Sequence, residues 1–444
     1  MEYPGSKFTH RIRLATLLIF IAAFFLISPI VLIYSAGYRF DFKNGLLLET
    51  GSLSVDILPK DAAVYLDGLK IDQRMPIRLN NITPHKYTLK ISATGYYDWE
   101  KQIEINKNKT TYIKEFFLLK KSKPKLLSND ISSDLALSSS GRYLAYTSKK
   151  GEKTKLVIAN EERQAPTLTF QMSGTLLLSW APQVNYLAVM SNNGGRKRLS
   201  VINAETGKIT EVYNADPILK YIWSDNSASN LYYGTKKGIY SFAPDLGVSS
   251  LITSAKFLDW YMADGTLWTM DVNTSTGELE IWKDALGFKS LFSSFSAIRD
   301  ASTSTLSAAE FKTIQRNTIL LKDQATNHFY IIRSSENFVV DANKYFFSKF
   351  NSWWLFWGQY ELWSYSEGDE PTLLSRSGEK FENVLSLDQF NTLALLRAGE
   401  ISALFPYFYL DRTMVDDSVK SMTNNPNSRT LYFSDNKGIW KLDY

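Results

Sequence analysis

The chain has three histidines, His10, His85 and His328, and these are the first residues to consider for acid–base chemistry. A Ser-His-Asp arrangement would have to use His85 or His328, because His10 lies in the basic N-terminal flank. Neither stands in a recognisable nucleophile context, and no G-x-S-x-G, H-E-x-x-H or phosphate-cradling glycine loop occurs. The chain has no cysteine, which excludes disulfides, thiolate metal sites and cysteine nucleophiles. We therefore predict that the protein is not an enzyme, and we assign no catalytic, cofactor-binding or metal-binding residue.

The nearest approach to a metal site is the segment DVNTSTGELE, which begins at Asp271. Its Asp271, Asn273 and Ser275 occupy positions that supply ligands in a calcium-binding loop. The glycine required at the sixth position is missing, and Trp282 stands at the twelfth position where a glutamate is needed. The segment is therefore predicted to be a hairpin turn.

A second candidate for chemistry is NSWWLFWGQYELWSY, residues 351–365, which holds four of the chain's eleven tryptophans. In a strand, Trp353 and Trp357 would point to one face and Trp354 to the other. Both faces are then apolar, as in a sheet covered on both sides. Burial of each ring at roughly 25 cal/mol per Å² favours the interior by several kcal/mol. We interpret this cluster as core between sheets, although rings at strand ends could still reach a groove.

The composition describes the elements that must hold these residues. A chain of 444 residues suggests two or more units unless one is a large all-β body. The aromatic fraction of 14% favours strands, and the charged fraction of 21% is ordinary for a folded protein. The net charge of +5 gives little support to nucleic-acid binding, which usually shows a concentrated basic face. We predict an all-β protein that does not bind nucleic acid.

One segment departs from this β pattern, because the run from Leu14 to Tyr38 carries no charge. It exceeds the roughly 20 residues needed to cross a bilayer. Lys7, Arg11 and Arg13 precede it, so the positive-inside rule keeps residues 1–13 in the cytoplasm. We predict a single transmembrane helix over 14–38, with the remaining chain extracytoplasmic. A signal peptide cleaved near Ser35 and Gly37 is the alternative, although the apolar run is longer than the usual 7–15 residues.

Short alternating strands follow between residues 50 and 119, for example SLSVDIL, KYTLKIS and KQIEI. Asp67 and Gly68 fit a tight hairpin turn. This stretch resembles the PEGA domain, a small β module of prokaryotic surface proteins, in keeping the residues Pro59, Ala62, Val64–Gly68, Pro76, Pro84, Tyr87, Gly95, Tyr96 and Trp99. It departs at Asp61, His85 and Lys86, which are turn positions. The resemblance implies a non-catalytic β-sandwich on the cell exterior. Tyr96, Tyr97 and Trp99 could form a sugar-stacking patch, but packing within the domain is the favoured interpretation.

Residues 120–129 form a basic linker, with four lysines around Pro124. Proline and like charges keep such a segment extended. Contact with anionic lipid or wall polymer is possible for these lysines, but we favour a solvated connector. The part KPKLL could also be an outermost strand that closes the following repeat region.

From residue 130 to 444 the sequence repeats a unit of strand, polar turn and strand. LYYGTKKGIYSF from Leu231 matches LYFSDNKGIWKL from Leu431, a separation of 200 residues or five units of about 40. That length is typical of a β-propeller blade. First strands are expected near the following residues: Leu135, Leu176, Leu219, Phe257, Leu306, Val340, Val384 and Val419. The irregular spacing leaves seven or eight blades open, with eight slightly favoured.

Three segments carry a second resemblance, namely Ser138–Tyr146, Trp180–Pro182 and Trp223–Asp225. They are similar to the W-S-P-D-G-x-x-L-A-Y repeat of TolB-like propellers, although each copy here is incomplete. A propeller must also close its ring, because otherwise the first and last blades expose strand edges. The KPKLL segment is expected to complete the last blade after Asp443.

These features predict a membrane-anchored binding or scaffolding protein of the cell envelope. Its expected partners are the lipid bilayer, through the N-terminal helix, and a protein or cell-wall polymer, through the propeller. The alternative is an extracytoplasmic hydrolase of glycosidase or peptidase type, because folding could bring distant carboxylates together on a propeller face. No cofactor is expected.

Overall fold

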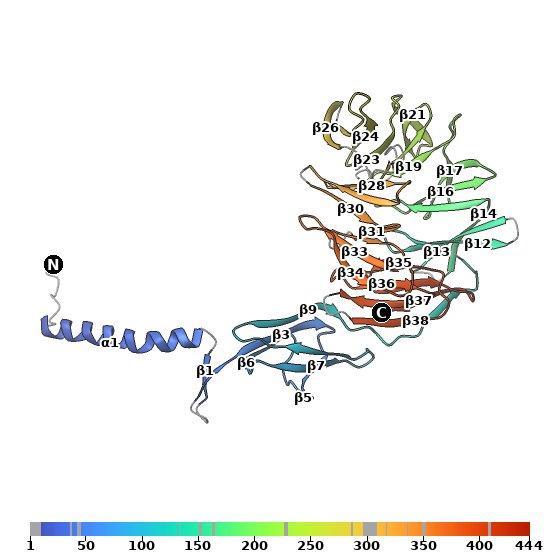
Figure 1. The fold of residues 1–444 in the computed structure, drawn as a ribbon. Helices are drawn as coiled ribbons and strands as arrows, with labels where there is room; N and C mark the ends of the chain where they lie inside the picture. Colours follow the sequence, from blue (N-terminus) through green and yellow to red (C-terminus); the bar gives the residue numbers. More distant parts are fainter. Residues whose placement is uncertain are drawn as a thin grey trace, which may run out of the picture. The chain divides into compact units, whose positions relative to one another are not determined.

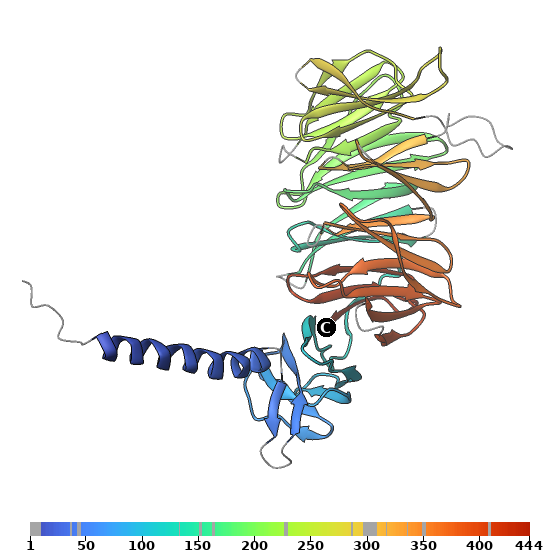
Figure 2. The ribbon, with the colours of Figure 1, turned by 60° about the vertical axis from the view of Figure 1, so that its left-hand side comes forward.

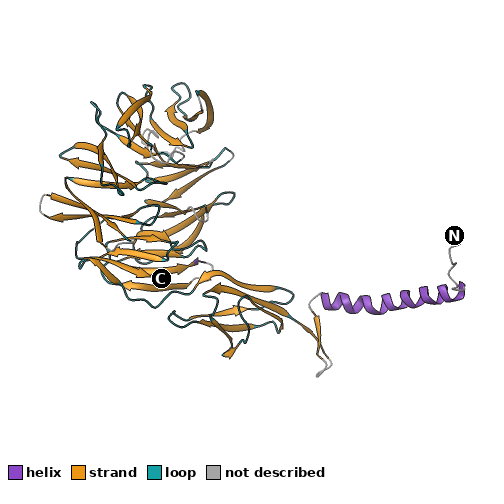
Figure 3. Cartoon of the chain, turned by 180° about the vertical axis from the view of Figure 1, so that it is seen from behind, coloured by secondary structure: helices purple, strands orange, loops and turns teal. Residues whose placement is uncertain are grey.

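The structure is a computed structural model, and the description covers residues 10–35, 38–41, 46–132, 134–150, 153–161, 165–225, 230–285, 287–295, 309–316, 318–334, 336–348, 352–406 and 410–444. The chain divides into two compact units, residues 1–122 and 123–444. Figure 1 shows the first unit in blue tones with the only described helix, and the second as a series of sheets running from green to red. Figure 3 shows that the remaining described chain consists of strands joined by loops and turns.

The helix α1 spans His10–Ser35 and includes Pro29. Its part from Ile12 to Ser35 is long and apolar enough to cross a membrane, and the rest of the protein buries none of it. A signal sequence near the N-terminus meets the same criterion. The helix begins earlier and ends earlier than predicted. Tyr38, the predicted end of the span, opens strand β1 (Tyr38–Asp41), which pairs with β2 (Leu46–Glu49) in an antiparallel hairpin.

Two sheets form the β-sandwich of the first unit. One has the order β6-β3-β9 and the other β5-β4-β7-β8. The strands are β3 (Gly51–Leu58), β4 (Ala63–Leu66), β5 (Leu69–Lys70), β6 (Ile77–Ile82), β7 (Lys86–Ser92), β8 (Trp99–Glu104) and β9 (Thr110–Phe117). Along β3 every second residue is buried, among them Leu53, Val55 and Ile57. This alternation is what a sheet with one covered face requires, so the sandwich prediction is confirmed.

The turn between β4 and β5 is the predicted hairpin. Asp67 and Gly68 both have positive φ angles, 48° and 81°, as a tight two-residue turn demands. The Asp67 side chain also accepts a hydrogen bond from the Thr88 amide at 2.7 Å, which ties the turn to β7. The departures from the PEGA pattern at other turns therefore leave this turn intact.

The second unit is a β-propeller of eight four-stranded sheets within the described residues. Blade 1 consists of β11 (Leu135–Leu137), β12 (Tyr143–Lys150), β13 (Lys153–Asn160) and β14 (Ala165–Ser173), and blade 2 of β15 (Thr175–Trp180), β16 (Tyr186–Asn193), β17 (Arg196–Asn203) and β18 (Ile209–Glu211). Blade 3 consists of β19 (Lys220–Trp223), β20 (Leu231–Thr235), β21 (Gly238–Ala243) and β22 (Val248–Thr253), and blade 4 of β23 (Asp259–Ala263), β24 (Thr266–Val272), β25 (Leu279–Ala285) and β26 (Phe288–Phe295).

Blade 5 consists of β27 (Ala309–Gln315), β28 (Thr318–Asp323), β29 (His328–Ile332) and β30 (Asn337–Asp341), and blade 6 of β31 (Lys344–Ser348), β32 (Trp353–Trp357), β33 (Glu361–Ser366) and β34 (Thr372–Arg376). Blade 7 consists of β35 (Phe381–Ser386), β36 (Leu393–Arg397), β37 (Glu400–Phe405) and β38 (Leu410–Asp416), and blade 8 of β39 (Ser421–Asn425), β40 (Thr430–Ser434), β41 (Ile439–Asp443) and β10 (Lys125–Ser128). The blades follow one another in the order of the sequence, as Figure 2 shows by the progression of colours.

The ring closes through β10, which joins blade 8 as its outermost strand by antiparallel pairing with β41. Lys125 pairs with Lys441 and Leu126 with Trp440. The segment predicted to be either a linker or a closing strand is thus a strand over Lys125–Ser128. Blades 8 and 1 also share a hydrophobic cluster that includes Leu144, Val157, Tyr432 and Ile439. Closure therefore joins the two ends of this unit and leaves no unpaired strand between them.

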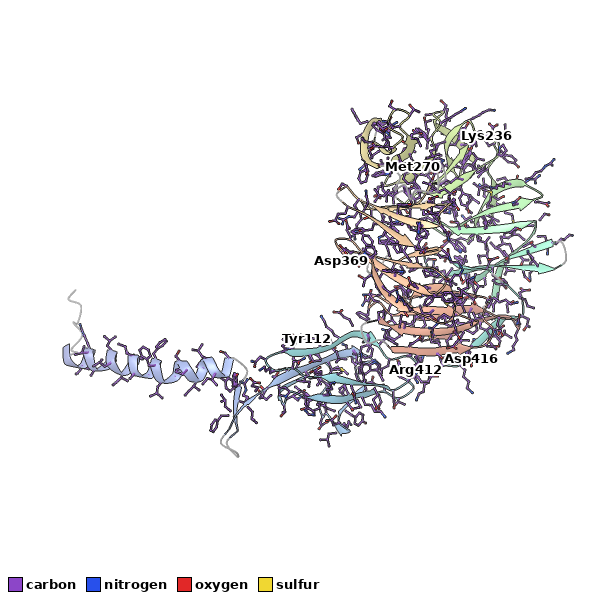
Figure 4. The ribbon with its side chains drawn as sticks, viewed as in Figure 1. Tyr112, Lys236, Met270, Asp369, Arg412 and Asp416 are labelled. Carbon is purple, nitrogen blue, oxygen red and sulfur yellow. The ribbon has the colours of Figure 1, made fainter. Side chains whose placement is uncertain are left out.

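Apolar side chains fill the spaces between neighbouring blades. Separate buried clusters join blade 1 to 2, 2 to 3, 3 to 4, 4 to 5, 5 to 6 and 6 to 7. In Figure 4, Met270 lies among these packed side chains and is fully buried, whereas Lys236 lies in an exposed turn. The core is thus distributed around the ring rather than gathered at one centre.

Most predicted first strands lie where the sequence placed them, including those near Leu135, Leu176, Leu219, Val384 and Val419. The prediction at Val340 is wrong, because Val340 lies in β30, the outermost strand of blade 5, and the first strand of blade 6 is β31. The two matching segments at Leu231 and Leu431 form the second and third strands of blades 3 and 8. They are five blades apart, as their spacing predicts. Leu306 lies outside the described residues.

Candidate functional site

The histidines considered for catalysis lie in ordinary structural positions. His85 lies in the turn before β7, and its ring contacts Tyr87 with centroids 3.7 Å apart. Its Nε2 is 3.9 Å from Asp67 Oδ2, beyond hydrogen-bond distance, and both side chains are about half exposed. His328 is the first residue of β29, where it pairs with Asp341 of β30, and His10 opens α1. His85 and His328 therefore belong to different units of the protein.

The segment from Asp271 forms the predicted hairpin turn between β24 and β25. Asn273 Oδ1 accepts hydrogen bonds from the amides of Ser275 and Thr276, at 2.9 and 3.2 Å. Asn273 is thus engaged with the turn's own backbone. Among the described residues, no group of three or more His, Cys, Asp or Glu side chains has the arrangement of a metal site.

The fully buried aspartates of the described chain, Asp323, Asp388 and Asp435, also serve turns. Asp388 Oδ1 accepts hydrogen bonds from the amides of Phe390 and Thr392 at 2.8 and 2.9 Å. Asp435 Oδ1 does the same for the amides of Lys437 and Gly438 at 2.7 and 2.8 Å. Burial raises the pKa of the Asp388 carboxyl, while the Thr392 and Phe390 donors oppose that rise. Both oxygens of Asp323 and of Asp388 accept hydrogen bonds within their turns, as does Oδ1 of Asp435, whereas Asp435 Oδ2 is buried without a partner.

One ion pair lies between the first strands of three blades. Lys220 Nζ of blade 3 is 2.8 Å from Asp259 Oδ2 of blade 4 and donates to the Trp260 carbonyl at 2.9 Å. The same Asp259 oxygen accepts the amide of Phe311 in blade 5 at 2.7 Å. Burial lowers the pKa of Lys220, and the Asp259 carboxylate opposes that effect. The ammonium group is fully engaged, so Lys220 links blades and is not a free nucleophile.

The tryptophan-rich segment lies in the core as predicted. All five residues of β32 are buried. Trp353 and Trp357 pack with Phe381 and Leu395 of blade 7. On the other face, Trp354 packs in the cluster shared with blade 5, where Phe329 lies. Tyr360 is an exception, since it lies outside β33 and is 51% exposed.

The proposed sugar-stacking patch of the first unit is not formed by its tryptophan. Trp99 is 4% exposed and packs against Phe116, with ring centroids 5.2 Å apart. Tyr96 and Tyr97 are half-buried, and the Tyr97 amide donates to the Leu119 carbonyl at 2.8 Å. The interpretation of these rings as domain packing is therefore supported.

The feature best suited to binding lies on blades 5 to 8, and sequence reasoning did not find it. Two hollows, with volumes of about 480 and 410 Å³, share Asn343, Lys344, Trp357 and Asn383 as lining residues. They therefore form one continuous depression, which we call the lysine groove. Its lysines are Lys312, Lys322, Lys344, Lys380 and Lys420. Its only acidic lining residue among the described side chains is Glu382.

The groove is formed by corresponding parts of successive blades. Lys344 opens the first strand of blade 6, and Lys380 and Lys420 directly precede the first strands of blades 7 and 8. Lys322 and Trp357 lie near or at the ends of the second strands of blades 5 and 6. The repeat thus places these side chains along one face of the ring. A lysine recurring just before or at the start of the first strand was the available sequence signal, but it is only recognisable once the blades are aligned.

Hydrogen bonds fix the walls of the groove. Lys322 Nζ donates to the Asn343 carbonyl and Lys344 Nζ to the Glu382 carbonyl, each at 2.7 Å. The Asn343 amide donates to the Trp357 carbonyl at 2.9 Å, and the Phe381 amide donates to the Gln359 carbonyl at 2.8 Å. Burial and the nearby Lys312 ammonium lower the pKa of Lys322. Positive charge is thus concentrated on a rigid surface, which loses little conformational freedom on binding.

Comparisons with known proteins agree with the two-part fold. Residues 50–117 match the PEGA domain family. The chain therefore carries a PEGA domain followed by an eight-bladed β-propeller. A PEGA domain and a propeller fit a binding or scaffolding role. No curated protein matches the sequence significantly.

Solved structures similar to this chain are β-propeller proteins at low identity. BamB from Moraxella catarrhalis is 11% identical, with 72% of this chain and 98% of that chain covered and a TM-score of 0.46. The β-propeller domain of the trilobed protease from Pyrococcus furiosus is 12% identical, with 66% and 97% covered and a TM-score of 0.41. An acylaminoacyl peptidase from Pyrococcus horikoshii is 12% identical, with 68% and 57% covered and a TM-score of 0.40. Likenesses at this level do not indicate what the chain binds or whether it catalyses a reaction.

Proposed function

We propose that this protein is a non-catalytic binding or scaffolding protein of the cell envelope. In this proposal α1 is a single-pass anchor with its N-terminus in the cytoplasm, and the PEGA domain and the propeller lie outside. The length and apolar character of α1 support the anchor. The basic residues before the apolar run support the orientation.

The observation that carries the binding role is the lysine groove. It joins two hollows across blades 5 to 8 on a rigid ring, and three of its lysines, Lys344, Lys380 and Lys420, are exposed. By contrast, the buried aspartates and the Lys220–Asp259 pair are engaged within the fold. The structure therefore favours a surface that attracts a partner over one that carries out acid–base chemistry.

The binding role is tested by retention of envelope material. The full-length chain, immobilised in uncharged detergent micelles, is expected to retain a component of the organism's own envelope fraction. A control with unrelated detergent-solubilised protein defines the background. Failure to retain anything above that background would contradict the binding role. Turnover of a glycoside, peptide or ester by the purified chain, lost on an Asp or Glu substitution, would reverse the assignment to a hydrolase.

The anchor and its orientation have a separate test. The native chain is expected to stay with the membrane after carbonate extraction and to keep its N-terminal residues. Protease added to intact spheroplasts is expected to degrade the propeller. Release of a chain that begins near Ser35 or Gly37 would instead show that the segment is a cleaved signal peptide.

A further inference from the structure

The chemistry of the lysine groove allows its ligand class to be narrowed, and this step rests on the proposed binding function. The groove has five lysines against one lining acid, Glu382. Glu310 lies just beyond the groove and pairs with Lys312 at 2.5 Å, so it neutralises the charge of Lys312. The other four lysines then share the single lining carboxylate of Glu382. An anion is therefore the favoured kind of ligand, because Coulomb attraction is strengthened in a depression with low-dielectric walls.

The absence of arginine from the lining is informative. Arginine binds carboxylates through a planar fork of two hydrogen bonds, whereas lysine acts as a compact point charge. Among the described residues that line the groove, every cation is a lysine. Such a surface attracts negative charge but makes no bidentate contact specific for a planar carboxylate. Phosphate groups suit it because their oxygens are arranged tetrahedrally and can meet point charges from several directions.

The aromatic residues of the groove argue against a nucleic acid. Single-stranded nucleic acids are usually held by aromatic faces on which bases stack. Trp357, Phe381 and Phe329 are at most 3% exposed, so their rings belong to the core. Tyr345, the remaining aromatic lining residue, is half-buried against Phe329 and its hydroxyl donates to the Lys312 carbonyl at 3.2 Å. A ligand with bases would gain charge attraction here but no stacking.

The extent of the groove favours a polymer over a single anion. Its lysines come from four successive blades: Lys344 opens the first strand of blade 6, and Lys380 and Lys420 directly precede the first strands of blades 7 and 8. A ligand with spaced negative charges can meet several of these lysines together, whereas one small anion cannot. Repeated weak contacts along a chain also gain affinity from their linkage.

The Trp357 ring provides an independent observation. Its Nε1 is buried and has no hydrogen-bond partner. A buried donor of this kind costs free energy unless an acceptor reaches it. Because Trp357 lines both hollows, a small shift of its ring on binding would bring Nε1 to a ligand oxygen.

We propose that the lysine groove binds a linear polymer that has no bases and carries phosphodiester groups at regular intervals, with the exposed lysines of the groove as the charge contacts. The affinity is then expected to fall steeply with salt, because binding releases the counterions condensed on the polymer. Neutral polymers of the envelope are not expected to bind here.

The test uses the full-length chain in uncharged micelles and long-chain inorganic polyphosphate as the probe, with binding measured by calorimetry. We expect the triple variant Lys344→Gln, Lys380→Gln, Lys420→Gln to weaken binding at least tenfold. The matched control changes three exposed lysines of blades 2 to 4 and their connections, Lys197→Gln, Lys236→Gln and Lys256→Gln, and is expected to weaken it less than twofold. Lys344→Arg should retain binding, because it keeps the charge.

Each comparison can overturn the proposal. Equal loss in both triple variants would mean attraction to net charge alone. Polyglutamate bound as tightly as polyphosphate, with the same sensitivity to the groove variant, would point to an acidic protein segment. Tighter binding of single-stranded oligothymidylate would point to a nucleic acid.

A fold check and the envelope assay separate the remaining outcomes. If the triple variant unfolds at a lower temperature, the single change Lys380→Gln is used, with a loss of about fivefold expected from one surface charge. Envelope material retained equally by the wild type and by the groove variant would reject this ligand class while leaving the binding function intact. No retention by the wild type would reject the binding function itself.

Discussion

At the scale of single residues, side chains only one position apart in the sequence serve different neighbours. Trp353 contributes to the core with blade 7 and Trp354 to the core with blade 5. Trp354 lies between Phe347 and Phe356, with ring centroids 4.6 and 6.4 Å away. Aromatic pairs in such geometries add to the free energy gained by burial alone. Each indole therefore stabilises one contact between blades.

We expect Trp354→Ala to lower the free energy of unfolding by about 3–5 kcal/mol, because it leaves a cavity between blades 5 and 6. Urea unfolding of the full-length chain in micelles measures this loss. The matched control is Tyr360→Ala, whose side chain is 51% exposed and which should change stability by no more than about 0.5 kcal/mol. Equal effects of the two changes would contradict the assignment of Trp354 to the core.

The residue scale also shows what the sequence could and could not predict. Alternation along β32 was sufficient to place Trp353 and Trp354 on opposite buried faces. Tyr360 lies outside this alternation, because the strand ends at Trp357 and β33 begins at Glu361, so Tyr360 belongs to a turn. The lysine groove could not be predicted, because it depends on which lysines the ring brings together from four blades.

At the scale of elements, the seam of the ring depends on close backbone contact. A Cβ added at Gly438 would lie 2.1 Å from the Ser128 carbonyl oxygen of β10. The corresponding Gly238 of blade 3 has the same relation to the Thr253 carbonyl oxygen, at 2.4 Å. Both glycines allow the outermost strand of a blade to approach the third, and at Gly438 that strand comes from the start of the unit.

We expect Gly438→Ala to destabilise the propeller by about 1–3 kcal/mol and to speed hydrogen exchange in β10. The steric clash separates β10 from β41, so mass spectrometry of peptides covering Lys125–Ser128 reports it directly. Gly238→Ala should cost a similar free energy without faster exchange in β10. Gly378→Ala, with no atom within 4 Å of the added Cβ, should be neutral. Unchanged exchange in β10 after Gly438→Ala would contradict this account of the seam.

Element boundaries were predictable where the repeat is regular. The offset of five blades between Leu231 and Leu431 places both segments on the same pair of strands. The error at Val340 arose because β30 and β31 are separated by only Ala342 and Asn343, so two consecutive strands gave one apolar signal. The start of α1 at His10 was missed because charged residues can begin a helix that later becomes apolar.

At the scale of the whole molecule, tyrosine hydroxyls along the first strands make stability depend on alkaline pH. Burial raises the pKa of Tyr221 in β19 and of Tyr261 in β23 to about 12. In the unfolded chain both phenols ionise near 10.0, the usual tyrosine value. The folded state keeps them neutral over the intervening range. Their contribution to stability is therefore complete below pH 10 and is lost as the pH rises from 10 toward 12.

Lys220 acts in the opposite direction and over a different range. Its pKa is lowered in the fold, so folding disfavours the ammonium form, and stability rises as the pH increases through that lowered value toward 10.5. Above 10.5 Lys220 is neutral in both states and contributes no further change. Lys220 therefore does not contribute to a loss of stability between pH 10.5 and 12.

We expect the urea midpoint of the full-length chain to fall as the pH is raised from 10 toward 12, since the unfolded state releases the phenolic protons of Tyr221 and Tyr261 more readily than the folded state. The double variant Tyr221→Phe, Tyr261→Phe keeps both rings and removes both protons, so its midpoint should fall less over the same range. The exposed Tyr360→Phe change serves as the control and should leave the slope of the wild type unaltered. Parallel slopes for the wild type and the double variant would show that these two hydroxyls do not govern alkaline unfolding and that other ionisations do.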